Sequence, residues 1–127
     1  MGLIENYLEY QHDYSLKYGK NTVVLIQVGS FFEIYGIEYP DGSRKGPVWE
    51  IAEICNFIVS CKKNVCVEGS RDNKAIMAGF PDHKYDKYLN HLVEEHKKTV
   101  VVIVQDKAET NTTRSIKGIY SPGTNLM

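Results

Sequence analysis

The sequence lacks several features that assign a chain to a broad class at once. No apolar run approaches the roughly 18 residues needed to cross a membrane, and the N-terminus has no basic and apolar signal pattern, so we expect no membrane partner. Only three cysteines occur, Cys55, Cys61 and Cys66, and none forms the C-x-x-C pair typical of zinc sites. They predict free thiols in an intracellular reducing compartment, without naming that compartment.

An excess of one charge is also missing. Lys and Arg number 15 against 16 Asp and Glu, which gives a net charge of -1. No global field therefore attracts nucleic acid, and any DNA binding must be local. Short basic loops could supply it if they cluster in space, although each alone is an ordinary solvated surface charge. These loops are Arg44-Lys45, Lys62-Lys63, and Arg71 with Lys74.

Motifs for catalysis are scarce. The sequence contains no Walker-type phosphate loop and no Gly-x-Ser-x-Gly nucleophile elbow. Pro81-Asp82 followed by Glu95-His96-Lys97 imitates the metal site of restriction-type nucleases. However, an intervening helix would separate Asp82 from Glu95 by about 20 Å, too far to share one divalent ion. A small metal-dependent nuclease is therefore only an alternative, and we expect this domain not to be an enzyme.

Helical and strand patterns alternate along the chain. Apolar runs at 22–28 and 99–104 predict buried strands, and shorter strands are expected after Gly29 and at 57–61, 75–78 and 115–120. Helical spacing predicts helices ending near Gly19, over 47–56, and from Pro81 onward. The buried stripe of the last helix is expected to be Tyr85, Tyr88, Leu89, Leu92, Val93 and His96. These elements predict a single α/β domain, with a mixed β-sheet of about five to six strands flanked by about three α-helices.

The most informative residues follow Gly29. Alternation along a strand places Phe31 and Glu33 on one face and Phe32 on the other. An aromatic ring beside one hydrogen-bond acceptor could unstack a DNA base and then contact its edge. Packing in the protein core is the alternative for these rings.

Two segments carry a resemblance to a known family. Residues 29–35 read Gly-Ser-Phe-Phe-Glu-Ile-Tyr, and residues 77–83 read Met-Ala-Gly-Phe-Pro-Asp-His. They resemble the Gly-Asp-Phe-Tyr-Glu-Leu-Phe and Met-Ala-Gly-Ile-Pro-Tyr-His segments of the N-terminal mismatch-recognition domain of the MutS DNA-repair ATPases. The closing 121–124 segment, Ser-Pro-Gly-Thr, is similar to the family's Thr-Pro-Gly-Thr. Cys61-Lys62-Lys63 departs from its Thr-Lys-Arg, where Lys63 keeps a phosphate charge but loses the fork of Arg. The loop from Tyr39 to Pro47 is longer than in the family, which suggests a divergent branch such as an organellar or giant-virus form.

The resemblance implies a function for specific residues. Phe31 would stack on a mispaired base and Glu33 would hydrogen-bond it, while Met77 would add apolar contacts near the wedge. The other DNA-binding positions implied are Lys62, Lys63, Arg71 and His83. The expected partner is double-stranded DNA with mismatches or small loops. Branched or recombination DNA is the alternative target, although the presence of both Phe31 and Glu33 favours mismatches.

The resemblance also bears on the parent protein. We expect residues 1–127 to be a fragment of a larger protein, because the chain closes just past a Pro-Gly turn. No cofactor is expected in this domain, since ATP and magnesium would bind an ATPase domain elsewhere in the parent. The parent is expected to be a dimeric clamp, and the isolated domain a monomer.

Overall fold

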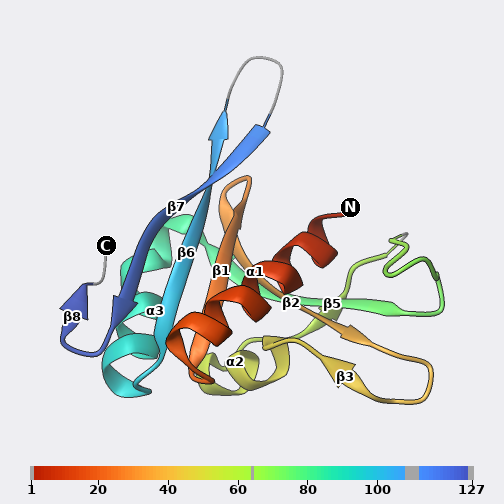
Figure 1. Ribbon diagram of the computed structural model, residues 1–127, viewed down its shortest axis with the longest axis horizontal. Coiled ribbons are helices and arrows are strands. Elements are labelled where there is room, and N and C mark those ends of the chain that lie inside the picture. The colour runs from red at the N-terminus through yellow and green to blue at the C-terminus, as the bar shows by residue number, and fades with distance from the viewer. Residues whose placement is uncertain (1, 64, 108–111, 126–127) are drawn as a thin grey trace.

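The computed structural model describes residues 2–63, 65–107 and 112–125 (Figure 1). Three α-helices are present in this part of the chain, α1 (Leu3–Tyr18), α2 (Val48–Cys55) and α3 (Tyr85–Asn90). A 3-10 turn, η1 (Asp82–Lys84), precedes α3, and a π-helical turn, η2 (His91–Glu95), follows it. The strands are β1 (Thr22–Val28), β2 (Phe31–Glu38), β3 (Arg44–Lys45), β4 (Ser60–Cys61), β5 (Lys74–Pro81), β6 (Thr99–Lys107), β7 (Thr112–Ser121) and β8 (Thr124–Asn125).

All described strands form one mixed sheet. Seven of them follow the order β4-β5-β2-β1-β6-β7-β8, and β3 pairs with β2 beside this path. The β1 and β6 strands run parallel, while the other pairs are antiparallel. The predicted α/β class and mixed sheet are confirmed, with slightly more strands than expected. The additional ones are the two-residue strands β3 and β8, which lie in segments whose Gly and Pro content indicates turns.

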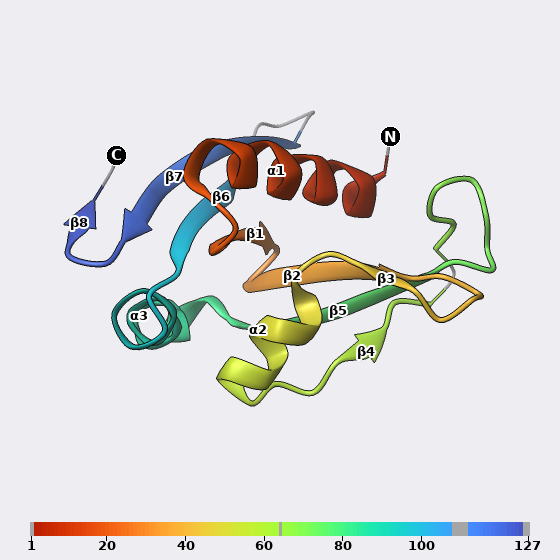
Figure 2. The ribbon, with the colours of Figure 1, turned by 60° about the horizontal axis from the view of Figure 1, so that its bottom comes forward.

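Helices cover both faces of the sheet. Figure 2 shows α1 on one side and α2 and α3 on the other. On the α1 side, the Tyr7 hydroxyl donates a 2.6 Å hydrogen bond to the Val24 carbonyl, and its ring meets Tyr35 edge-to-face at 5.2 Å. On the opposite side, Phe32 contacts Phe80 at a ring separation of 5.7 Å. Alternate residues of β2 therefore enter two different layers of the core, as strand geometry requires.

The helical segment after Pro81 differs from its predicted pattern near its end. Leu92 and Val93 are buried as predicted, but His96 is exposed. The π turn η2 adds one residue to the last turn and ends at Glu95, so the 3.6-residue period no longer holds at His96. The stripe that the period places on the core therefore ends at Val93.

All three cysteines are free; Cys55 is buried, and Cys61 and Cys66 are exposed. In the described part of the chain, no helix has the length and apolar character needed to cross a membrane.

Candidate nucleic-acid interface

A tight turn presents the start of β2 at one end of the sheet. Gly29 and Ser30 connect the paired residues Val28 and Phe31. Gly29 has φ of +61°, which a two-residue hairpin turn of the II′ type requires at its first position and which glycine adopts without strain. The Ser30 carbonyl accepts a 2.8 Å hydrogen bond from the Asp82 backbone N–H. The turn is thus fixed to the beginning of η1, with Phe31 directly after it.

The two neighbouring rings of the turn have different environments. Phe31 is 47% exposed, whereas Phe32 is 3% exposed. Phe32 lies among aromatic side chains, with ring separations of 5.7 Å to Phe80 and 5.2 Å to Tyr85. Of the four phenylalanines in the chain, Phe31 alone is exposed. The core-packing alternative therefore applies to Phe32, and Phe31 remains available to a partner.

The Glu33 carboxylate lies on the Phe31 face of β2 but is largely buried, with 11% of its side chain exposed. The Tyr35 hydroxyl donates a hydrogen bond to its Oε1 atom, and Lys62 Nζ lies 3.9 Å from the same oxygen. Its paired neighbour on β5 is Gly79. A Cβ atom at Gly79 would lie 3.4 Å from Glu33 Cγ and 2.4 Å from the Phe32 carbonyl oxygen. The missing side chain at Gly79 therefore provides the space that Glu33 occupies.

Lys62 reaches Glu33 across an intervening strand. The sheet order β4-β5-β2 places Met77 of β5 opposite Tyr35 on one side and opposite Ser60 on the other. The Lys62 backbone N–H donates a 2.8 Å hydrogen bond to the Ala75 carbonyl, which continues the β4–β5 pairing. Its ammonium lies 5.5 Å from the centre of the Tyr35 ring, within cation-π range. Met77 is half-buried on β5, the strand between β4 and β2. We call Glu33, Tyr35, Lys62 and Met77 the carboxylate cluster.

Two more of the sequence-predicted residues lie close in sequence to these positions. His83 is exposed in η1, two residues after Pro81, and Pro81 pairs directly with Phe31. Lys63 is exposed and follows Lys62, whose backbone bonds Ala75, so Lys63 lies toward the Lys74 end of β5 and away from Phe31. The structure therefore supports a shared location for Phe31, His83 and the carboxylate cluster at neighbouring positions of β2, β5 and β4.

Arg71 lies at the opposite end of the sheet. It precedes β5, whose first residue, Lys74, pairs with Glu38 at the end of β2. Seven residues of strand separate Phe31 from Glu38, which corresponds to about 23 Å. The exposed Arg71 is therefore not brought together with Phe31.

The basic loop at 44–45 is engaged in ion pairs within the protein. Arg44 Nε lies 3.3 Å from Glu38 Oε1, and its guanidinium carbon is 4.7 Å from the centre of the Trp49 ring. Lys45 Nζ lies 3.4 Å from Glu68 Oε2. These contacts hold β3 against the rest of the protein, so this loop differs from Lys63, which is simply exposed.

Tyr35 and Arg114 are not among the site residues predicted from the sequence. Burial, together with the hydrogen bond to Glu33, raises the pKa of Tyr35 well above its ordinary value. The positive charge of Arg114 on β7 acts on the Tyr35 pKa in the opposite direction. Tyr35 could have been found from its position two residues after Glu33 on the same strand face. For Arg114 no local signal exists, because its position depends on the sheet order.

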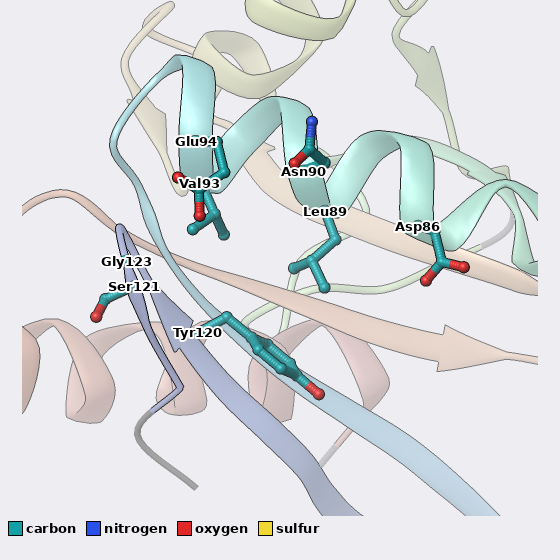
Figure 3. A pocket seen from close by; sticks show the side chains of 8 residues that line it. All are labelled: Asp86, Leu89, Asn90, Val93, Glu94, Tyr120, Ser121 and Gly123. Carbon is teal, nitrogen blue, oxygen red and sulfur yellow. The ribbon is translucent and has the colours of Figure 1, made fainter.

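A cavity elsewhere in the protein has a different character. It has a volume of about 470 Å³ and lies between the α3–η2 segment and the end of β7. Figure 3 shows Leu89 and Val93 directed from the helical segment toward Tyr120, with the carboxylates of Asp86 and Glu94 also at the cavity. Two carboxylates disfavour binding of a phosphate backbone, so we do not include this cavity in the candidate interface.

The candidate nuclease ligands are placed as the sequence predicts. Asp82 begins η1 and Glu95 ends η2, and the segment between them is helical throughout. The Glu95 carboxylate is bonded to the His91 ring. Among the described residues, no three His, Cys, Asp or Glu side chains are grouped as metal ligands would be.

Comparison with known proteins identifies the family. A model of MutS domain I matches residues 49–127, which is more than half of the chain. The chain belongs to the MutS domain I family. It is also 30% identical over 122 residues to a protein of Acanthamoeba polyphaga mimivirus that is named as a DNA mismatch repair mutS homolog.

The two comparisons cover different parts of the site. The MutS domain I match includes Lys62, Met77 and His83 but begins after Phe31 and Glu33. The similarity to the mimivirus protein extends over 94% of this chain. The chain spans only about a tenth of that relative's length, since the aligned region is 10% of it. The predicted resemblance to MutS is confirmed, and the family is one of DNA mismatch repair.

Proposed function

We propose that this domain recognises mispaired or unpaired bases in duplex DNA, with Phe31 as the stacking residue. The observation that carries the proposal is the exposed Phe31 ring at the end of a tight hairpin, next to a carboxylate on the same strand face. An exposed apolar ring gains from leaving water, and stacking on a base is worth about 1 to 3 kcal/mol. The other phenylalanines lie in or against the core and are unsuited to this role.

Selectivity in this proposal comes from the weakness of the DNA at a mismatch. Opening a base step costs a few kcal/mol, and the cost is least where pairing is already defective. This cost is similar to the stacking gain, so the wedge enters a mismatch and leaves a matched duplex unkinked. The domain would then recognise how easily the duplex deforms at a site, and not its base sequence.

Glu33 has a separate role in the proposal. A carboxylate next to DNA phosphates is repelled by a normal duplex, but it can accept a hydrogen bond from the edge of a displaced base. Both effects favour a mismatch over a matched duplex. Lys62 and His83 would contact the phosphates near Glu33 and Phe31, and Met77 would add apolar contacts. Arg71 and Lys63 would contact DNA only outside the immediate wedge, because they lie toward the far end of β2.

The parent protein enters only as a further part of the proposal. We place its ATPase activity and its dimeric clamp outside these 127 residues, because the chain corresponds to about a tenth of the length of its mimivirus relative. The isolated domain would bind weakly, since it lacks the gain in effective concentration that a clamp provides.

The test is a comparison of two duplexes that differ by one central G·T mismatch. Fluorescence anisotropy at low salt measures the dissociation constant of each duplex for the wild-type chain and for Glu33→Ala. We expect wild type to prefer the mismatch. Glu33→Ala should keep or raise the affinity for the matched duplex while the mismatch preference shrinks. The same affinity ratio in both proteins would refute the role of Glu33, and no wild-type preference would refute the proposed function.

A further inference from the structure

The Glu33 carboxylate is held in a position that does not suit contact with a base on Phe31. Phe31, Glu33 and Tyr35 follow one another on one face of β2, at intervals of two residues. The Tyr35 hydroxyl binds Glu33 Oε1, so the carboxylate is drawn toward Tyr35, on the side away from Phe31. The Glu33 side chain is 11% exposed in this position, whereas Phe31 is 47% exposed. A base stacked on Phe31 would therefore meet the ring before it meets the carboxylate.

Lys62 strengthens the same arrangement. Its ammonium lies 3.9 Å from the oxygen that Tyr35 binds, and 5.5 Å from the Tyr35 ring. The Tyr35 hydroxyl and the Lys62 ammonium therefore both contact Oε1 of Glu33, and neither of these two contacts uses Oε2. The Lys62 side chain is one-third exposed, and 3.9 Å is at the outer limit of an ion pair. DNA phosphates are therefore able to compete with Glu33 for this ammonium.

The Tyr35 hydroxyl is separable from the packing of its ring. A Phe ring would fill the same space without donating to Glu33. Tyr35 is fully buried and its ring already contacts Tyr7. The hydroxyl therefore contributes a bond to Glu33 that packing of the ring does not require.

We propose that Tyr35 and Lys62 form a latch that holds Glu33 away from Phe31 until DNA binds. Phosphate draws Lys62 away, and the freed carboxylate then turns toward the base on Phe31 by giving up its bond to Tyr35. Tyr35 is a positioning residue in this scheme, and the strength of its bond sets the size of the mismatch preference. This inference rests on the proposed function, because it assumes that Glu33 contacts a displaced base.

The first experiment is Tyr35→Phe, which removes the hydroxyl and keeps the ring. Anisotropy titrations with the matched and G·T duplexes should show an affinity ratio that rises by about threefold to tenfold, because the carboxylate no longer breaks a charge-assisted bond to reach the base. Tyr39→Phe is the matched control, since the Tyr39 hydroxyl donates a 2.7 Å bond to Glu68 on the exposed surface. This control should leave the ratio unchanged.

A double variant separates a positioning role from a structural one. In the Glu33→Gln background, Tyr35→Phe should have no further effect on the ratio, because its effect acts through the Glu33 carboxylate. Lys62→Met should lower the affinity for both duplexes and raise the ratio, since it removes a phosphate contact and one half of the latch. Lys63→Met removes the same charge one residue away and should lower both affinities equally.

The outcomes distinguish the latch from the proposed function. The latch alone is overturned if Tyr35→Phe leaves unchanged or lowers the ratio of mismatched to matched affinity, while the wild type prefers the mismatch and Phe31→Ala abolishes this preference. Absence of any wild-type preference, together with no effect of Phe31→Ala, overturns the proposed function, and the latch falls with it. A raised ratio that disappears in the Glu33→Gln background supports both.

Discussion

Replacement of Phe31 by Ala separates binding from folding, because the ring is half exposed. The structure predicts that Phe31→Ala changes the free energy of unfolding by less than about 0.5 kcal/mol, as for other surface substitutions. For a chain of 127 residues this corresponds to a shift in melting temperature of less than about 2 °C. The affinity for a G·T duplex should fall much more. Loss of one stacked base costs about 1 to 3 kcal/mol, or about 5-fold to 150-fold in the dissociation constant.

The assay for this prediction combines a thermal melt with anisotropy titrations of both duplexes. Ile58→Ala is the matched control, because Ile58 is an apolar side chain that is 91% exposed and not part of the carboxylate cluster. The control should leave the mismatch preference unchanged. An equal loss of affinity for matched and mismatched DNA in Phe31→Ala would refute the wedge. A fall of many degrees in the melting temperature would show instead that the ring stabilises the fold.

Three further predictions concern the fold and the environment of two side chains within it. Gly79→Ala should destabilise the protein by about 1 to 3 kcal/mol, because the new Cβ would lie 2.4 Å from the Phe32 carbonyl oxygen. The melting temperature should fall by about 4 to 11 °C, and an unchanged melting temperature would show that the strands adjust freely. Burial raises the pKa of the Cys55 thiol to about 11. At pH 8 the exposed Cys61 and Cys66 should therefore react with a disulfide reagent in the native protein, and Cys55 only after unfolding. Fast reaction of all three thiols in the native protein would contradict this. The hydrogen bond to the Ile54 carbonyl raises the pKa of His91. The stabilising contribution of His91 should therefore be present below its ordinary pKa near 6.5 and be lost as the pH rises through the raised pKa. The free energies of urea unfolding of wild type and His91→Gln should differ more at pH 5.5 than at pH 8, and an equal difference at both would contradict this.

Much of the fold follows from local sequence patterns. The apolar runs predict β1 and β6 because a strand buried on both faces needs apolar residues at every position. Gly19 and Pro47 mark helix boundaries for stereochemical reasons, and the helices end and begin beside them. The phase of the helical segment near His96 could not be predicted in this way. A π turn changes the number of residues per turn, and no local composition rule gives its position.

The candidate site was predictable only where it depends on a single strand. Alternation along β2 is enough to place Phe31 and Glu33 on one face. The contact between Lys62 and Glu33 depends on β4 and β2 lying on either side of β5, and sheet order is a property of the whole domain. The same limit applies to Arg71, which sequence analysis groups with the other basic residues. In the structure, the pairing of Lys74 with Glu38 places it at the opposite end of the sheet.

The most direct test of the central claim is an amide NMR titration of the wild-type chain with the matched and the G·T duplex at low salt. It resolves weak binding residue by residue. The account predicts that amide shifts at Phe31, Glu33 and Met77 appear selectively with the mismatch, and that they vanish in Phe31→Ala. Equal shifts with both duplexes, or no shifts at these three residues with the mismatch, would contradict the claim that Phe31 recognises a mispaired base.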